Sequence, residues 1–388
     1  MKKVSILLLF MLSSCTINNN SGIVNISHQV PGFFIGDEFV FPMNTITNLR
    51  MYEQAKYDEV KDGFDTLVTN LSKEFDRYHT YDDINNLYTL NDSCGKDEYI
   101  KVSDNLFDAI SIGIDLMKIS DGNFNIFMGN LIDAYSPHLS AMDGYVFDDE
   151  MLKSYVDAIP GIENIDDVIE LDKDTNSIKL NEFNGNKVII SLGAIAKGYI
   201  LDKAYSYLKP FGYQCEFDAG SSTLATIGSK PTDVNGKYTI SFRSPSLSSQ
   251  NEVMFSCLLD SDIFISTSGD YEQCYLVDDK LYHHILSPFT GKSNNYYRTV
   301  SLISNNKDSL AILDAISTAI FNIEKIEDVE KLLYDVKNIY GIDVYFALAT
   351  PYESSYEDYN LIVSKKMKEC ICSTFNLHVK DVTILNDF

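Results

Sequence analysis

Asp314 and Thr318 are the residues whose types and spacing point most directly to chemistry. They lie four residues apart in the mostly apolar stretch Leu310 to Phe321, so on a helix they share one face, a turn apart. A carboxylate and a hydroxyl are hard oxygen ligands of the kind that Mg²⁺ or Ca²⁺ takes. A lone Asp buried in such a helix needs a partner. The spacing alone nevertheless favours a narrow stripe that faces solvent.

The adjacent pair His283 and His284 is the second candidate. It falls in a predicted strand, Leu281 to Leu286, where neighbouring side chains point to opposite faces, so at most one of the two can face a given site. A histidine there could act as acid, base or hydrogen-bond donor to phosphate. The alternative is a pair of surface histidines.

Two short segments, 266–270 and 218–222, each offer hydroxyls and one carboxylate, and the sequence predicts both as turns. A serine nucleophile paired with His284 is conceivable. The sequence has no G-x-S-x-G elbow, however, and this weakens that interpretation.

The stretch Lys187 to Gly198 organises the rest of the chain. Its β-branched residues, 188–190, predict a short buried strand, a small-residue turn follows, and a helix is predicted over 199–208. A helix N-terminus after glycine-containing turns can face an anion, and Lys197 adds positive charge. The order of residues is not that of a Walker loop. A tight connection between packed elements is the commoner use of such a stretch.

The first 15 residues predict export. Lys2 and Lys3 precede a short apolar run, Val4 to Leu12, and small residues then lead to Cys15. The run is too short to span a bilayer and indicates a signal peptide. The residues around Cys15 resemble a bacterial lipobox, which implies removal of residues 1–14 and acylation of Cys15, as a lipid anchor on the extracytoplasmic face of the cell membrane. Ordinary secretion is the alternative.

Composition narrows the function classes. The 388 residues carry a net charge of −25, which argues against nucleic acid as a partner, and the 45% hydrophobic content predicts a real core. Six cysteines besides Cys15 permit disulfides without requiring them. No C-x-x-C pair is present, so a zinc site is not expected.

The pattern of elements predicts one α+β domain of mixed, mainly antiparallel strands with packed helices. Helices are predicted over 57–78, 103–120 and 308–323, and a hairpin joins 273–277 to 281–286. Residues 15–36, rich in Asn and Ser near their start, are predicted as a flexible tether, and 37–388 as the folded domain.

Taken together, the segments resemble one family, the ApbE-type FAD:protein FMN transferases, over about Phe41 to Ala347. No single segment is diagnostic, but seven in the family's order make coincidence improbable. The segments are Phe41-Pro-Met43-Asn-Thr45, Asp121-Gly-Asn-Phe-Asn125, Ser191-Leu-Gly-Ala-Ile-Ala-Lys-Gly-Tyr199 with Asp202, Asp218-Ala-Gly-Ser221, Thr267-Ser-Gly-Asp-Tyr271, His284-Ile-Leu-Ser-Pro-Phe-Thr-Gly291 and Asp314-Ala-Ile-Ser-Thr318. The family pattern usually has Asp at three positions where this chain has Asn125, Ser191 and Ser287.

The resemblance implies a reaction in which a threonine hydroxyl of an acceptor protein attacks the FMN phosphorus of FAD and AMP leaves. It implies that Asp314, Thr318 and a main-chain carbonyl near Ala194 bind Mg²⁺, with Ca²⁺ or Mn²⁺ possible, and that His284 and Asp314 act in catalysis. The acceptor would be an exported or membrane electron-transfer protein. The positions that match FAD contacts in the family are Met43, Tyr78, Asn123, Phe124, Asn125, Ser191, Lys197 and Ile285.

Two further interpretations stay open. An FAD pyrophosphatase would use water on the same site and give FMN and AMP. A non-catalytic flavin-binding lipoprotein would keep FAD intact.

Overall fold

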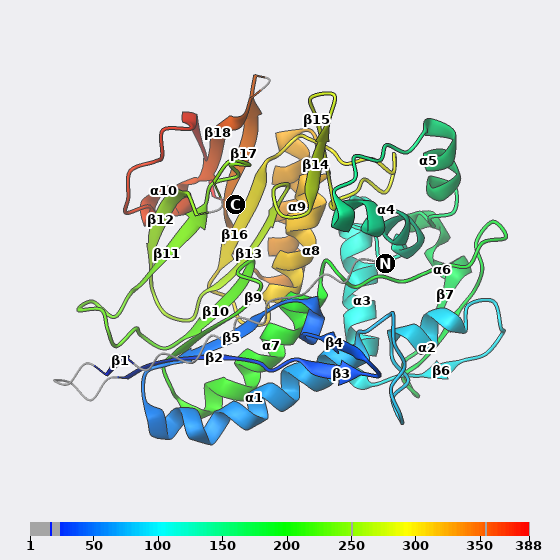
Figure 1. Ribbon diagram of the computed structural model, residues 1–388, viewed down its shortest axis with the longest axis horizontal. Coiled ribbons are helices and arrows are strands. Elements are labelled where there is room, and N and C mark those ends of the chain that lie inside the picture. The colour runs from blue at the N-terminus through cyan, green and yellow to red at the C-terminus, as the bar shows by residue number, and fades with distance from the viewer. Residues whose placement is uncertain (1–15, 18–23, 250, 354, 388) are drawn as a thin grey trace.

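A ten-stranded sheet runs through the molecule (Figure 1). The structure is a computed structural model, and it describes residues 16–17, 24–249, 251–353 and 355–387. Neighbouring strands are antiparallel except for the last pair, β18 and β19, which is parallel. In spatial order the strands are β1 (Thr16–Ile17), β2 (Val24–Gln29), β5 (Thr47–Met51), β9 (Cys215–Ala219), β10 (Thr223–Ile227), β13 (Phe264–Gly269), β16 (Thr299–Ser304), β17 (Tyr345–Tyr352), β18 (Ser355–Ser364) and β19 (Val379–Leu385).

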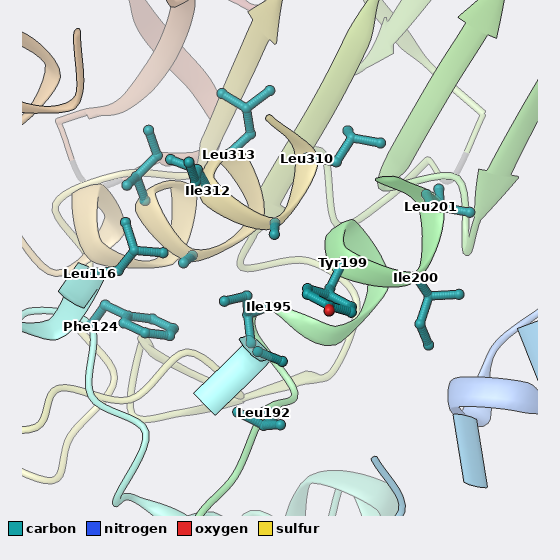
Figure 2. Close-up of a cluster of buried hydrophobic side chains, with 14 of the residues drawn as sticks. Leu116, Phe124, Leu192, Ile195, Tyr199, Ile200, Leu201, Leu310, Ile312 and Leu313 are labelled. Carbon is teal, nitrogen blue, oxygen red and sulfur yellow. The ribbon is translucent and has the colours of Figure 1, made fainter. Parts of the chain in front are cut away.

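Helices cover one face of this sheet, where α1, α7 and α8 enclose the largest apolar core. Helix α8 is buried on nearly every side, as a helix that is apolar all round must be. Figure 2 shows side chains of α7 and α8 in this core, with Leu116 of α3 and Phe124 beside them. The helices are α1 (Gln54–Glu74), α2 (Leu87–Asp92), α3 (Asp104–Ile119), α4 (Gly129–Ala141), α5 (Asp149–Val156), α6 (Ile165–Val168), α7 (Ala196–Leu208), α8 (Leu310–Phe321), α9 (Ile326–Tyr340) and α10 (Lys365–Cys370).

The other face of the sheet is covered by a two-stranded ribbon, β11 (Tyr238–Arg243) and β12 (Val253–Leu259), together with α10. Apolar side chains of the ribbon pack against those of β13, β17 and β18 in a second core. The sheet is therefore sandwiched, with helices on one side and a strand pair on the other.

Smaller elements surround this frame. Two hairpins are formed by β3 (Phe33–Ile35) with β4 (Glu38–Val40), and by β14 (Cys274–Val277) with β15 (Lys280–His283). A three-stranded sheet contains β6 (Ile100–Lys101), β8 (Ser177–Leu180) and β7 (Ile169–Asp172). A third apolar cluster joins α4 and α5 to the second hairpin.

The predicted α+β class, the mainly antiparallel sheet and the main helices are confirmed. Ser103 caps α3 as predicted, because its hydroxyl accepts a hydrogen bond from the Leu106 amide at 3.1 Å. The predicted hairpin is confirmed as β14 and β15, although it ends at His283 and not at Leu286. The third predicted helix is α8, which is shorter than predicted at both ends.

The predicted strand over 188–190 is wrong. Val188 and Ile190 are buried, but the segment pairs with no strand in the described ranges, and its backbone bonds to side chains and loops. The Asn91 amide group exchanges two hydrogen bonds of 2.9 Å with the backbone of Ile190, as a neighbouring strand would do. The polar side chain of Asn91 thus satisfies backbone groups that a β-ladder normally satisfies.

Three other expectations also differ from the structure. Residues 266–269 continue β13 and are not a turn. Asp314 is buried and does not face solvent, because α8 packs against both α7 and the sheet. The flexible tether predicted for 15–36 does not hold over its second half, where β2 pairs with β5 and β3 pairs with β4.

The signal peptide and Cys15 lie outside the described residues. Within the described ranges, no helix is both long enough and apolar enough to cross a bilayer. The cysteines that could have formed disulfides are free: Cys94, Cys215, Cys257, Cys274, Cys370 and Cys372.

Candidate active site

A cavity of about 1040 Å³ opens where the ends of α7 and α8 meet the sheet and the two hairpins. Its lining comes from segments far apart in the sequence, and these include parts of all seven segments of the family pattern. Each site residue expected from the sequence, apart from Cys15, contributes to this lining: Met43, Tyr78, Asn123, Phe124, Asn125, Ser191, Ala194, Lys197, His284, Ile285, Asp314 and Thr318.

Asp314 is the buried carboxylate of the cavity. Its Oδ1 accepts hydrogen bonds from the hydroxyls of Ser266 (2.9 Å) and Thr223 (3.2 Å), and its Oδ2 accepts one from the Gly198 amide (3.1 Å). Burial raises the pKa of the Asp314 carboxyl, and the nearby Lys197 ammonium opposes this shift. A carboxylate has about four lone-pair sites, so one on Oδ2 is left for a ligand.

Close packing of α7 against α8 sets the position of Asp314. A Cβ on Gly198 would lie 2.1 Å from the carbonyl oxygen of Leu310, so only glycine permits this approach. One turn further along α7, the Asp202 carboxylate accepts hydrogen bonds from the amides of Leu310 (3.1 Å) and Ala311 (2.9 Å). Asp202 therefore supplies the acceptor at the N-terminus of α8 that a capping residue normally provides.

Only one of the two histidines lines the cavity, as expected, although β15 ends at His283 and His284 lies just beyond it. His283 is buried, and its Nε2 lies 2.9 Å from the carbonyl oxygen of Asn294. His284 faces the cavity. The side chain is exposed on the cavity side. Partial desolvation by the surrounding protein nevertheless lowers the pKa of His284, and the positive charge of Lys197 lowers it further. The imidazole is therefore neutral near pH 7. Lys197 itself donates to the Ser222 hydroxyl at 2.6 Å.

The oxygen atoms around Asp314 are hard ligands of the kind that a divalent cation such as Mg²⁺ takes. Asp314 offers a carboxylate, Thr318 offers a hydroxyl from the next turn, and the loop at Ala194 borders the same space. Mg²⁺ typically takes one or two carboxylates and fills its other positions with water and substrate phosphate. Nowhere in the described part of the chain do three or more His, Cys, Asp or Glu residues gather as a metal cage.

Strained and exposed residues border the cavity on the side of the first hairpin. Met43 and Asn44 both have positive φ values, 55° and 52°, which non-glycine residues rarely adopt. Tyr78 is 49% exposed, and Arg77 holds it in place. The Arg77 guanidinium forms a two-pronged ion pair with Asp133 at 2.6 and 2.9 Å and donates to the Tyr78 hydroxyl at 2.6 Å.

The structure gives a local role to two of the three residues that depart from the family pattern, and for one of them, Asn125, a reason for the departure. Asn125 donates from Nδ2 to the carbonyl oxygen of Pro160 at 2.9 Å, a bond that a carboxylate cannot make. Ser287 is buried, and its hydroxyl accepts from the amides of Phe289 and Thr290, each at 3.3 Å. These two residues serve the loops that carry them. Ser191 alone borders the cavity with no such structural bond.

Sequence reasoning missed several residues that hold the site together. Thr223 and Ser266 both donate to Asp314. Ser266 begins one of the two hydroxyl-bearing segments noted in the sequence, but nothing in the local sequence of either residue links it to Asp314. Asn322 donates to the carbonyl oxygens of Leu286 (3.1 Å) and Asn123 (3.3 Å), and so ties two cavity loops to the end of α8. The sequence could have indicated Asn322 only as a polar residue after an apolar helix.

The cavity also extends along the face of the sheet opposite the helices. In the strand register, Asn48, Asp218, Leu224 and Ile265 form a row across β5, β9, β10 and β13, and all four line the cavity. Residues 239–243 of β11 also line this part of the cavity. We call this part, with Arg50, Glu216, Lys230 and Glu272, the sheet arm, and the part around Asp314, Lys197 and His284 the helix arm.

Comparison with known proteins identifies the family pattern. The model of the ApbE family matches residues 43–342. The chain is 25% identical over 279 residues to the FAD:protein FMN transferase of Vibrio cholerae, which covers 72% of this chain and 78% of that relative. It is 33% identical over 118 residues to the enzyme of the same name from Klebsiella pneumoniae, which covers 30% of this chain and only 34% of that relative.

Solved structures share the fold. The ApbE protein of Thermotoga maritima superposes with a TM-score of 0.69 at 22% identity, over 90% of this chain and all of that one. The flavin transferase ApbE of Vibrio cholerae gives a TM-score of 0.64 at 18% identity, over 89% of this chain and 99% of that one.

Proposed function

The chain belongs to the ApbE family, and from this membership we propose that it transfers FMN from FAD to a threonine hydroxyl of an acceptor protein and releases AMP. The observation that carries the proposal is that segments spread from Met43 to Thr318 bring their polar side chains into one cavity. The curated relatives are named FAD:protein FMN transferases, and this supports the transfer of FMN from FAD to a protein.

In this reaction the threonine oxygen forms a bond to the FMN phosphorus, the bond from that phosphorus to the bridging oxygen breaks, and AMP leaves with the electron pair. His284 is placed in the cavity to accept the hydroxyl proton, since a neutral imidazole is a competent base. Lys197 places a positive charge beside the Ser222 hydroxyl, where it can hold an anionic oxygen. The flavin and adenosine parts would contact the residues expected from the family, with Tyr78 as an aromatic platform.

Asp314, Thr318 and the carbonyl near Ala194 would hold Mg²⁺, with Ca²⁺ or Mn²⁺ as alternatives. When bound, the ion would neutralise negative charge on the pyrophosphate. The hydrogen bonds from Gly198, Thr223 and Ser266 hold the Asp314 carboxylate in one orientation before any ligand arrives. This rigidity supports a role in positioning.

The decisive experiment incubates the chain without residues 1–15 with FAD and Mg²⁺, with and without an acceptor peptide that carries one threonine. AMP release and acceptor mass are measured, with Asp314→Ala as the control. A mass gain that matches FMN, absent in the control, is the expected result. AMP and FMN without acceptor modification would assign the pyrophosphatase. Intact bound FAD would assign a non-catalytic flavin-binding protein.

We also propose that the mature protein begins at Cys15 and is lipid-anchored on the extracytoplasmic face of a bacterial membrane, where an electron-transfer protein would meet it. The basic start, the short apolar run and the small residues before Cys15 support this. We expect the protein to incorporate labelled palmitate. The Cys15→Ala variant should lose this incorporation and be released from the membrane fraction. Labelling that persists in the variant would contradict it.

A further inference from the structure

We propose that the open edge of β11 binds an extended segment of the acceptor protein as an added strand, and that an acidic side chain of this segment pairs with Lys230. The inference rests on the proposed function, because it names the surface that brings the acceptor to the site. It concerns the sheet arm of the cavity, where only Asp218 belongs to the family pattern and none of the expected flavin contacts lies.

The two edges of the β11–β12 ribbon differ. The outer edge of β12 is covered by residues 370–376, since the amides of Cys372 and Asn376 donate to the carbonyl oxygens of Ser256 (2.9 Å) and Met254 (3.1 Å). The opposite edge, on β11, has no strand partner within the described ranges. Proteins usually cover or blunt such an edge, because it is a template for pairing with another chain. An uncovered edge beside a cavity is therefore suited to binding an extended peptide.

The β11 edge faces the cavity along its length. Five consecutive residues, 239–243, line the cavity, and Thr239 and Ser241 are exposed. Alternate residues of a strand point to opposite faces. If only the side chains on one face of β11 lined the cavity, every second residue would do so. Because five consecutive residues line it, the edge of the strand itself borders the cavity.

The edge leads toward the helix arm. The guanidinium of Arg243, at the end of β11, lies 4.5 Å from the centre of the Tyr271 ring. Tyr271 and Ser268 line the same cavity, and the hydroxyl of Ser268 lies 2.7 Å from that of Ser317 in α8. Ser317 directly precedes Thr318. A strand laid along β11 therefore points one of its ends toward the space where Asp314 and Thr318 lie.

Charge supports an acidic residue in the bound segment. The sheet arm contains three cations, and two of them are already paired: Arg50 with Glu216, and Arg243 with Glu272. Lys230 has no carboxylate within 4 Å in the part of the chain that the structure describes, and its ammonium lies 5.6 Å from the Tyr238 ring centre. Lys230 is partly buried, so an incoming carboxylate would meet a cation that water solvates incompletely.

The test uses a library of twelve-residue peptides with one central threonine and random flanking residues, incubated with the chain lacking residues 1–15, FAD and Mg²⁺. Peptides that gain the mass of FMN are sequenced. We expect Asp or Glu to be enriched at one position, and this enrichment to disappear with Lys230→Gln. The best peptide is then remade with single N-methyl groups at successive backbone amides on each side of the threonine.

Strand addition uses every second amide of the added strand. We expect N-methylation to reduce FMN transfer about tenfold or more at alternate positions and to have little effect at those between them. Labelling without this alternation overturns the inference but leaves the proposed function standing. Absence of labelled peptides in the whole library contradicts the proposed function, and the inference falls with it.

Variants of β11 provide an independent check. Of the neighbours Ile240 and Ser241, one has its amide directed at β12 and the other at the open edge. Proline at the residue whose amide is directed at β12, Ile240→Pro or Ser241→Pro, should lower Tm. Proline at the residue whose amide is directed at the open edge should keep Tm and FAD binding but abolish transfer to the peptide. If the variant that keeps Tm and FAD binding still labels the peptide at the wild-type rate, the β11 edge is not the docking site.

Discussion

On the helix arm of the cavity, the Asp314 carboxylate is buried, receives three hydrogen bonds and lies beside a glycine that no other residue could replace without a clash. On the sheet arm, Lys230 has no carboxylate partner in the described residues, and Thr239 and Ser241 of β11 are exposed along a strand edge. Both arms belong to one cavity, yet the first is built like a protein core and the second like a protein surface.

This difference separates two tasks. A group that must be held in one place during a reaction needs neighbours that fix its position, and these neighbours couple its placement to the stability of the fold. A surface that receives a polypeptide needs unpaired donors, acceptors and charge, and these contribute little to stability. Substitutions in the helix arm should therefore change activity and stability together, and those in the sheet arm should change binding of the acceptor alone.

The largest effect is expected from Asp314→Asn. The amide keeps the shape of the side chain but removes the charge that would bind the metal, and metal-ion catalysis is worth several kcal/mol, so transfer should fall about 1,000-fold. AMP release at saturating FAD and Mg²⁺ measures it, with Tm as the control for folding. Retention of more than about a tenth of the rate would contradict the metal role.

The pH dependence of the same carboxylate has a definite sign. Because burial raises the pKa of Asp314, protons compete with the metal at less acidic pH than for an ordinary Asp. The apparent affinity for Mg²⁺ should fall as the pH is lowered through this raised pKa.

The contact between α7 and α8 should give the next largest effect. Gly198→Ala places a methyl group 2.1 Å from the Leu310 carbonyl oxygen, so we expect the free energy of unfolding to fall by about 1–3 kcal/mol or more. Gly193→Ala is the matched control, since a Cβ there would meet only the Ser191 hydroxyl at 3.7 Å. Chemical unfolding without FAD measures both variants. Equal stability of the two would show that α7 and α8 can separate without cost.

The sequence could predict those parts of the site that depend on local pattern. Asp314 and Thr318 share a helix face because the helix period fixes that relation. The strand pattern also led to the correct expectation that one of His283 and His284 faces the site, although β15 ends at His283. The sequence could not predict that Asp314 is buried, since this depends on how α8 packs against α7 and the sheet. Nor could it link Thr223 and Ser266 to Asp314, which they reach only through the register of distant strands.

The same limit explains the errors in the fold. Residues 188–190 have the composition of a strand, but their partner is the side chain of Asn91, about a hundred residues earlier in the chain. The sheet arm went unpredicted because a strand edge left without a partner has no local sequence signature.

A smaller effect, with a pH signature, is expected from Asp202→Asn. Burial raises the pKa of Asp202 from 3.8 to about 7, and its two backbone hydrogen bonds only partly oppose this shift. The stability due to this raised pKa is present in full below about pH 4 and is lost as the pH rises through about 7. The Asn variant lacks this titration, so its stability relative to wild type should rise between pH 4 and pH 8.

Urea unfolding at several pH values measures that difference, and parallel curves would contradict it. Asp270, whose pKa is also raised to about 7 by burial, is present in both proteins and cancels from the comparison.

The smallest expected effect is on FAD binding, and it tests whether FAD occupies the helix arm alone. Lys197 and Lys230 line the same cavity, and neither has a carboxylate within 4 Å in the described ranges. If FAD occupies the helix arm alone, Lys197→Gln should weaken FAD binding about tenfold, as the loss of one charged hydrogen bond does, while Lys230→Gln should change it less than about twofold. Quenching of flavin fluorescence measures both. A similar loss in both variants would place FAD across both arms, and β11 would then have no free space in which to receive an acceptor.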